Sequence, residues 1–386
     1  MSGSCDRIWH RLNEESALLI EERDNRKLSR AGAQIKSHFD QMSGAYDAST
    51  SSSQFIPAQF YPAVECARGR ALKRALIEKH KGKAFDEQVT GVEVINELGT
   101  CYLVETKASS NLPVIAPDKA ATNLLADFKL LHGIRETTEL ALRKQGYDRI
   151  PDLVEHDRFG IHARRFLRLV ETRDTLGLAE WVGRRFSRSC PLALCVSGFH
   201  TPDELLFVDI ETLGLFASPV VIIGVAMVLE GALTVRQYVA RDVDEEPAVL
   251  AGLLSHVGAS TAFVTFNGKA FDVPFLEQRL AFYRIDGQLQ RAHFDMLPFA
   301  RRRWRGLTAD CKLTSIERQV TGARESDISS ALVPEFYETY LRTGNVGPLI
   351  GIVDHNRQDL IALAHIFSTL VRGNSDRRKR FERSAR

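Results

Sequence analysis

Two carboxylates near the middle of the sequence have the side-chain type and spacing that could bind a metal ion. Asp209 and Glu211 lie two positions apart at the end of the apolar segment LLFVDIE, and side chains two apart on a strand point to the same face. Burying both without partners would be costly, so they need a cation or strong hydrogen-bond donors. A hard divalent cation such as Mg²⁺, which prefers oxygen ligands, would satisfy them.

Three further candidates follow later in the chain. Asp272 ends FNGKAFD after the apolar segment TAFVTF, and His355 precedes Asp359 by one helical turn in DHNRQD. Taken singly, an Asp at a strand end is usually a turn or cap residue, and a His on an amphipathic helix is usually solvated or packed. Together, four carboxylates and a histidine predict hydrolysis of phosphodiester bonds with two ions, Mg²⁺ or Mn²⁺. The ions would stabilise the attacking and leaving oxygens, and a nearby base would help to deprotonate water.

These residues need elements that bring them together, and residues 199–372 have the pattern of an α/β domain. LLFVDIE, VVIIGVAMVL and TVRQYVA are expected to be strands, the first two central because they are nearly continuous in apolar residues. EEPAVLAGLLSHV predicts a helix, TAFVTF another strand and FDVPFLEQRLAFY another helix. This order predicts an RNase H-like mixed sheet flanked by helices, preceded by a smaller, mainly helical region.

Several segments resemble the motifs of the DEDD superfamily, and most of all the YprB-like family of RNase H-like exonucleases. The likeness covers the part from Leu205 to Val371 well and leaves out the first 54 residues. It lies in the segments LFVDIETLGL, VTFNGKAFDVPFLEQR, HFDMLPFARRRWR, VPEFYETYLRTGN and VDHNRQDLIAL and, more loosely, ELGTCYLVET.

The resemblance implies a role for each candidate. Asp209, Glu211 and Asp359 would bind metal, Asp272 would act on the second ion, directly or through water, and His355 would be the base. Superfamily members with a histidine base usually place it five residues before the last Asp, whereas here the spacing is four, as in the branch that uses tyrosine. The resemblance also implies 3′–5′ exonuclease activity, which the residues alone do not distinguish from endonuclease activity.

Two segments are candidates for binding the substrate, DNA or RNA. Asn267, Gly268 and Lys269 are expected on a turn just before Asp272, where glycine permits close approach and lysine offers a phosphate contact. A second segment is basic with one aromatic residue inside it, and could hold a nucleic-acid backbone and stack a base. The alternative is a solvated helix face with the tryptophan packed inward. The second segment consists of Arg301, Arg302, Arg303, Trp304 and Arg305. Asp295 in HFDML is either an acidic neighbour of the site or a cap.

The rest of the sequence limits the class of protein. Among 386 residues the net charge is only +2, so nucleic acid would have to bind local basic patches. Six scattered cysteines without a CxxC pair predict neither a disulfide scaffold nor a zinc site, and favour a reducing cytoplasm. With no signal-like or membrane-length apolar segment, a cytoplasmic protein without a membrane partner is expected.

The N-terminal part and the tail carry weaker signals. Residues 1–54 are expected to be a disordered polar arm, and residues 373–386 a disordered basic tail. Residues 55–198 should contain a small β-hairpin within VTGVEVINELGTCYLVETKA, a helix from Asp118 to Leu131, and shorter helices around His132–Ile134. That turn is typical either of a helix-hairpin-helix module that binds phosphate or of an ordinary helical packing unit.

A second function class stays open at this point. The chain could be a nucleic-acid-binding or scaffolding protein whose nuclease fold has lost its activity. Loss of one carboxylate would favour that class, whereas the complete acidic set favours an enzyme. A purely structural role would give Asp209 and Glu211 no reason to be there.

Overall fold

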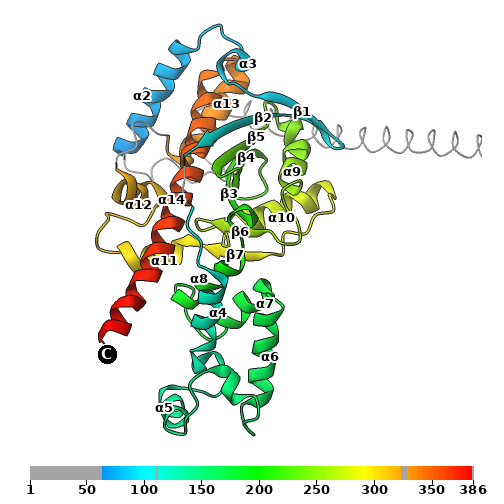
Figure 1. Ribbon diagram of the computed structural model, residues 1–386. Coiled ribbons are helices and arrows are strands. Elements are labelled where there is room, and N and C mark those ends of the chain that lie inside the picture. The colour runs from blue at the N-terminus through cyan, green and yellow to red at the C-terminus, as the bar shows by residue number, and fades with distance from the viewer. Residues whose placement is uncertain (1–62, 110–111, 323–327, 385–386) are drawn as a thin grey trace, which may run out of the picture.

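The computed structural model describes residues 63–109, 112–322 and 328–384. One seven-stranded mixed sheet runs through its centre in the order β1-β2-β5-β4-β3-β6-β7 (Figure 1). The RNase H-like α/β fold expected from the pattern is confirmed. The strands are β1 (Val92–Asn96), β2 (Gly99–Ala108), β3 (Leu205–Thr212), β4 (Val220–Leu229), β5 (Ala232–Val239), β6 (Ala262–Thr265) and β7 (Ala292–Asp295).

Strand β3 lies inside the sheet and sets the position of the first two carboxylates. It pairs antiparallel with β4, where Asp209 lies opposite Gly224, and parallel with β6. Both β3 and β4 are almost wholly buried, as their apolar runs predict. Since β6 is parallel to β3 and ends first, the residues after β6 reach the end of β3 that bears Asp209 and Glu211.

Helices cover both faces of the sheet (Figure 1). The long helix α14 (Gly347–Ser384) packs on β3, β4 and β5, and around it lie α2 (Ala63–Lys79), α11 (Met296–Trp304), α12 (Leu313–Thr321) and α13 (Val333–Thr343). Helices α9 (Glu246–Leu254) and α10 (Asp272–Tyr283) cover the opposite face. None of the helices in the described ranges is long and apolar enough to cross a membrane.

The N-terminal region is less separate than the sequence indicates. The predicted hairpin forms β1 and β2, but β2 pairs along its length with β5 and so belongs to the main sheet. The remaining elements of the region are α3 (Phe85–Gln88), α4 (Pro117–Leu125), α5 (Glu136–Lys144), α6 (Gly160–Glu171), α7 (Thr175–Gly183), α8 (Pro191–Cys195) and the 3-10 turns Phe128–Leu130, Ile150–Leu153, Val196–Phe199 and Pro202–Glu204.

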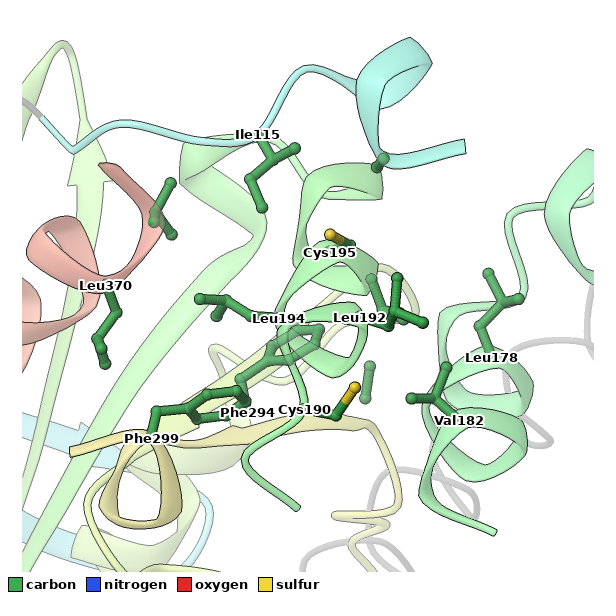
Figure 2. Packing of buried hydrophobic residues seen from close by; sticks show 14 of the residues in the cluster. Ile115, Leu178, Val182, Cys190, Leu192, Leu194, Cys195, Phe294, Phe299 and Leu370 are labelled. Carbon is green, nitrogen blue, oxygen red and sulfur yellow. The ribbon is translucent and has the colours of Figure 1, made fainter. Parts of the chain in front are cut away.

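The helices α4 to α8 share one hydrophobic core with the sheet. Figure 2 shows Leu192 and Leu194 of α8 beside Phe294 of β7, with Phe299 of α11 and Leu370 of α14 close by. A protein starting near residue 199 would therefore expose this core to water.

Two local expectations also differ from the structure. The helix expected to reach Leu131 ends at Leu125, because Asp127 then caps a separate 3-10 turn by accepting the N–H of Lys129. The expected disordered tail is helical, since α14 continues to Ser384. Its arginines, lysine and glutamate are good helix formers, and no proline interrupts them. The expected arm, residues 1–54, lies outside the described residues.

One buried ion pair ties α9, α10 and β4 together. Glu246 is fully buried and accepts both the Nε and the Nη2 hydrogens of Arg279, at 2.7 and 2.6 Å, as well as the hydroxyl of Tyr283 and the N–H of Val220. Arg279 is only 3% exposed. Every acceptor position of this carboxylate is thus used within the protein.

Replacing Glu246 by Gln should destabilise the fold strongly. The change leaves the Arg279 cation buried without its counter-charge, which typically costs about 3–5 kcal/mol. Urea unfolding followed by circular dichroism would measure the loss. Glu180→Gln is the matched control, because Glu180 is half exposed and pairs with Arg184 on the surface, where such pairs contribute about 0–1 kcal/mol. Equal losses in the two variants would contradict the expectation.

Candidate metal and catalytic site

The predicted site residues come together at one end of β3. Burial, together with the charges of Asp359, Glu211 and Asp272, raises the pKa of Asp209 well above its usual range, while His355 opposes the shift. The four carboxylates and the histidine, spread over 151 positions from Asp209 to Asp359 in the sequence, are therefore near enough to interact electrostatically.

Asp272 begins α10 and faces back toward β3. It is 7% exposed, and the N–H of Ile210, which lies between the two β3 carboxylates, donates to its carboxylate. Burial and the charge of Asp295 raise its pKa to about 7. The chain reversal between β6 and α10 thus places this carboxylate beside the β3 pair.

His355 and Asp359 come from the middle of α14. His355 is 2% exposed, and its Nε2 lies 3.8 Å from both Glu211 Oε1 and Asp359 Oδ2. The hydroxyl of Ser330, just before α13, lies 3.0 Å from the same nitrogen. The four-residue spacing therefore directs the imidazole between two carboxylates of the site.

The donor chemistry of the site fits a divalent cation. The charges of Glu211, Asp272 and Asp359 raise the pKa of Asp209, and a cation would relieve that repulsion with the oxygen ligands that Mg²⁺ and Mn²⁺ prefer. No three His, Cys, Asp or Glu side chains form a ready-made metal cage within the described residues. The fit therefore rests on charge and ligand type, not on a preformed coordination shell. Asp209, Glu211, Asp272 and Asp359 are the residues that could hold the ion or ions.

Two buried amide side chains support Asp209, and the sequence analysis did not identify them. The Nδ2 of Asn356 donates to Asp209 Oδ2 at 2.8 Å, and Asn356 Oδ1 accepts from Gln237 Nε2 at 2.9 Å. Asn356 and Gln237 are both fully buried. The one available signal was the position of Asn356 next to His355 in the DHNRQD segment, which by itself specifies no partner.

The turn before Asp272 has a structural role that the sequence did not reveal. Asp295 accepts the N–H groups of Asn267 and Lys269 and caps α11 through the N–H of Leu297, so of its two expected roles the cap is confirmed. A Cβ on Gly268 would lie 2.5 Å from Thr265. Gly268 is therefore needed for packing within the turn, and its expected contact with substrate stays a prediction. The side chains of Asn267 and Lys269 remain exposed.

The basic segment of α11 resolves into an arginine surface and a packed tryptophan. Trp304 is 5% exposed, belongs to the main core and has the guanidinium of Arg303 over its ring. A base cannot stack on a ring that the core covers, so the inward-packing alternative holds for Trp304. The side chains of Arg301, Arg302, Arg303 and Arg305 are exposed.

A further cation lies near this surface, from the helical region. Arg188 is exposed and close enough for its charge to act on Lys269: partial desolvation lowers the pKa of Lys269, Asp295 opposes the shift, and Arg188 adds to it. The neighbouring Ser189 carbonyl accepts from Arg302 Nη1 at 2.9 Å. Arg188, Lys269 and Arg302 thus form a basic seam where the helical region meets the sheet.

An apolar loop follows the β3 carboxylates in the chain. Leu215 and Phe216 are 37% and 74% exposed in the turn that joins β3 to β4. The turn is held by hydrogen bonds from Thr212 Oγ1 to the Gly214 carbonyl and from the N–H of Leu213 to the Pro219 carbonyl. Two large apolar side chains are therefore presented to solvent four and five residues after Glu211.

The turn at residues 132–135 is less suited to binding a phosphate than its sequence indicates. Glu136 and Glu139 lie in the first turn of α5, where their charge opposes an anion. Arg143 is used within the fold, since it donates to Glu139 and to the carbonyls of Asp148 and Ala126. These contacts favour the packing alternative.

Comparison with known proteins gives the same region a family. Residues 206–371 match the model of the RNase_H superfamily. Over 174 residues the chain is 31% identical to the uncharacterized protein YprB of Bacillus subtilis (strain 168), a match that covers 44% of this chain and 42% of that protein. The chain therefore spans less than half the length of this relative. The sheet, the site and this match together show an RNase H-like domain between residues 206 and 371 that is similar to YprB.

Proposed function

We propose that the protein is a metal-dependent nuclease that hydrolyses phosphodiester bonds of DNA or RNA as a 3′–5′ exonuclease. The observation that carries the proposal is the convergence of Asp209, Glu211, Asp272 and Asp359 with His355, in a domain of a superfamily of nucleases. A catalytically inactive binding protein would have no use for three carboxylates whose charges oppose the ionisation of Asp209.

The proposed chemistry assigns separate tasks to these side chains. Asp209, Glu211 and Asp359 would hold divalent cations, with Asp272 on the second, and such ions supply charge stabilisation at the attacking and leaving oxygens. His355 Nε2, between Glu211 and Asp359, is placed to accept a proton from the attacking water. Burial of His355 and Asp272 keeps bulk solvent away from these groups, which strengthens their electrostatic effect.

A labelled-substrate assay tests the proposal. The full chain should degrade end-labelled DNA or RNA in Mg²⁺ or Mn²⁺ and stop in excess EDTA. Shortening from a labelled 5′ end, with inhibition when the 3′ end is blocked, is expected of a 3′–5′ exonuclease. Cleavage of a circular substrate would instead show endonuclease activity. Absence of metal-dependent cleavage on every single- and double-stranded substrate would overturn the proposal.

The apolar loop and the basic seam would supply contacts for a strand end. Leu215 and Phe216 offer an apolar surface against which the base of the terminal nucleotide can lie, as aromatic side chains do for single strands. The basic seam of Arg188, Lys269 and Arg302 offers cations to the phosphates further along the strand, and Asn267 and the arginines at positions 301, 303 and 305 lie on the segments that form it.

Reversing charge in the seam should weaken substrate binding while sparing catalysis. With Arg188→Glu and Lys269→Glu combined, we expect a higher KM at an almost unchanged kcat, because the seam contacts phosphates and not the reacting atoms. Each lost phosphate contact should reduce the slope of log affinity against log salt by about 0.7 for a single strand. Fluorescence anisotropy in Ca²⁺ or EDTA at several salt concentrations would measure the slope.

The control for this charge reversal lies far from the seam. Lys83 is exposed between α2 and α3, which lie at the opposite end of the molecule from α4–α8 in Figure 1. Lys83→Glu should leave the slope unchanged. An unchanged slope in the double variant as well would show that the seam does not contact nucleic acid.

A further inference from the structure

We infer that Asn356, held by Gln237 and admitted by Gly224, is a positioning residue that fixes the carboxylate of Asp209 for cation binding. The inference rests on the proposed function, because it gives Asp209 the task of holding a cation. It concerns three residues from three elements, namely α14, β5 and β4.

The orientation of the Asn356 amide follows from its partners. Gln237 Nε2 lies 2.8 Å from the carbonyl oxygen of Val353, which can only accept a hydrogen bond, so this end of Gln237 is the donor. The same nitrogen lies 2.9 Å from Asn356, whose facing atom must therefore be the oxygen. That leaves the amino group of Asn356 to face Asp209, where it reaches Oδ2 at 2.8 Å and the backbone carbonyl at 3.2 Å.

Gly224 provides the space for this contact. It lies opposite Asp209 in the β3–β4 ladder, and a Cβ there would lie 2.1 Å from Asn356 Oδ1 and 2.7 Å from Leu360 Cδ1. The glycine has no positive φ and sits in the middle of a buried strand. Its conformational freedom is not needed there, and a strand glycine with no side chain to pack weakens the sheet. The close approach of Asn356 gives a reason for glycine at this position.

The consequence for the site is that one oxygen of the Asp209 carboxylate, Oδ2, is already held by a hydrogen bond from Asn356. A donor on Oδ2 fixes the direction of this oxygen and restricts the rotation of the carboxylate. Second-layer hydrogen bonds of this kind orient metal ligands, and their loss typically costs about 10–100-fold in metal affinity. Asn356 touches no reacting atom in this arrangement and acts through Asp209.

Mn²⁺ binding by the full chain, measured by calorimetry or electron paramagnetic resonance without substrate, tests the inference. Asn356→Leu, which keeps the branched shape and removes the donor, should weaken Mn²⁺ binding by about 10–100-fold. Gly224→Ala should weaken it through the Cβ contact alone, since it removes no polar group. Gln358→Leu, an amide on the same helix that is only partly buried, is the matched control and should bind Mn²⁺ as the wild type does.

Gln237→Met separates positioning from a general loss of structure. Without Gln237 the Asn356 amide can turn over, so Mn²⁺ affinity should fall by less than in Asn356→Leu. The double variant should bind no more weakly than Asn356→Leu alone, because Gln237 acts only through Asn356. Thermal unfolding of each variant in EDTA identifies any that fail to fold, and Gly224→Ala then carries the test in place of Asn356→Leu.

The outcomes separate this inference from the proposed function. Wild-type Mn²⁺ affinity in folded Asn356→Leu or Gly224→Ala would overturn the inference and leave the nuclease proposal standing. Additive losses from Gln237→Met and Asn356→Leu would also overturn it, because independent effects mean that no relay exists. A wild-type chain that binds no Mn²⁺ and cleaves no nucleic acid would overturn the proposed function itself.

Discussion

The Asp209→Asn variant should lose metal-dependent cleavage almost completely while its fold stays intact. Asparagine keeps the shape and can still accept from Asn356 Nδ2, but it removes the charge of a central ligand. Loss of a cation ligand should exceed the roughly 10²–10⁴-fold that a general base contributes. Turnover of an end-labelled oligonucleotide in Mg²⁺ would measure the loss, with binding of the same oligonucleotide in EDTA largely unchanged.

Stability supplies a second readout for Asp209→Asn. Folding raises the pKa of Asp209, so the folded state binds its proton more tightly than the unfolded chain does. The carboxylate therefore costs stability as pH rises through the range in which it ionises. In EDTA at pH 8 the variant should be at least as stable as the wild type. Mg²⁺ should stabilise the wild type more than the variant.

The exposed Asp203 provides the control for this substitution. Asp203→Asn alters a surface carboxylate before β3 and should leave both turnover and the response to Mg²⁺ unchanged. Full cleavage by Asp209→Asn, or cleavage by the wild type in excess EDTA, would refute the two-metal hypothesis.

The His355→Ala variant should lower kcat by about 10²–10⁴-fold, the usual contribution of a general base, and change Mn²⁺ affinity little. The imidazole lies between Glu211 and Asp359 at 3.8 Å from each, within reach of a water that these carboxylates would help to hold. The residual rate should rise with pH as hydroxide replaces the missing base. Single-turnover rates across pH and Mn²⁺ titrations would measure the two effects separately.

His365→Ala, further along α14, is the matched control for this histidine and should retain wild-type turnover. A different result would assign His355 another task. If Mn²⁺ affinity in His355→Ala fell as much as kcat, the imidazole and its Ser330 contact would serve to orient Glu211 and Asp359. Wild-type turnover with an unchanged pH profile would show that His355 only packs.

The sequence by itself determined the elements around the site. The apolar runs that predicted β3 and β4 correspond to the observed strands closely, because a strand buried on both faces needs a continuous apolar run between turn residues. Helix α10 was predicted from FDVPFLEQRLAFY and begins at Asp272. The set of carboxylates was also visible, because four such residues and a histidine occurring together are harder to explain as turn or cap residues than any one of them alone.

Local sequence patterns were less informative where the role of a residue depends on a segment elsewhere in the chain. Gly268, expected to contact substrate, also packs closely against Thr265, and of the two alternatives for Trp304 the structure shows the packed one. Both positions have ordinary local sequence contexts. What decided their roles was the turn that Asp295 holds and the packing of α11, neither of which a segment specifies alone.

Only the tertiary structure decided how the site is supported and where the protein divides. Gln237 and Asn356 are 119 positions apart, and Asn356 and Asp209 are 147 apart, so no periodicity links them. The hairpin β1–β2 likewise joins the main sheet through β5, across more than a hundred residues. Hydrophobic patterning records whether a residue is buried, because burial depends on local periodicity. It does not record which residue a buried polar group will meet, because that depends on how the elements dock.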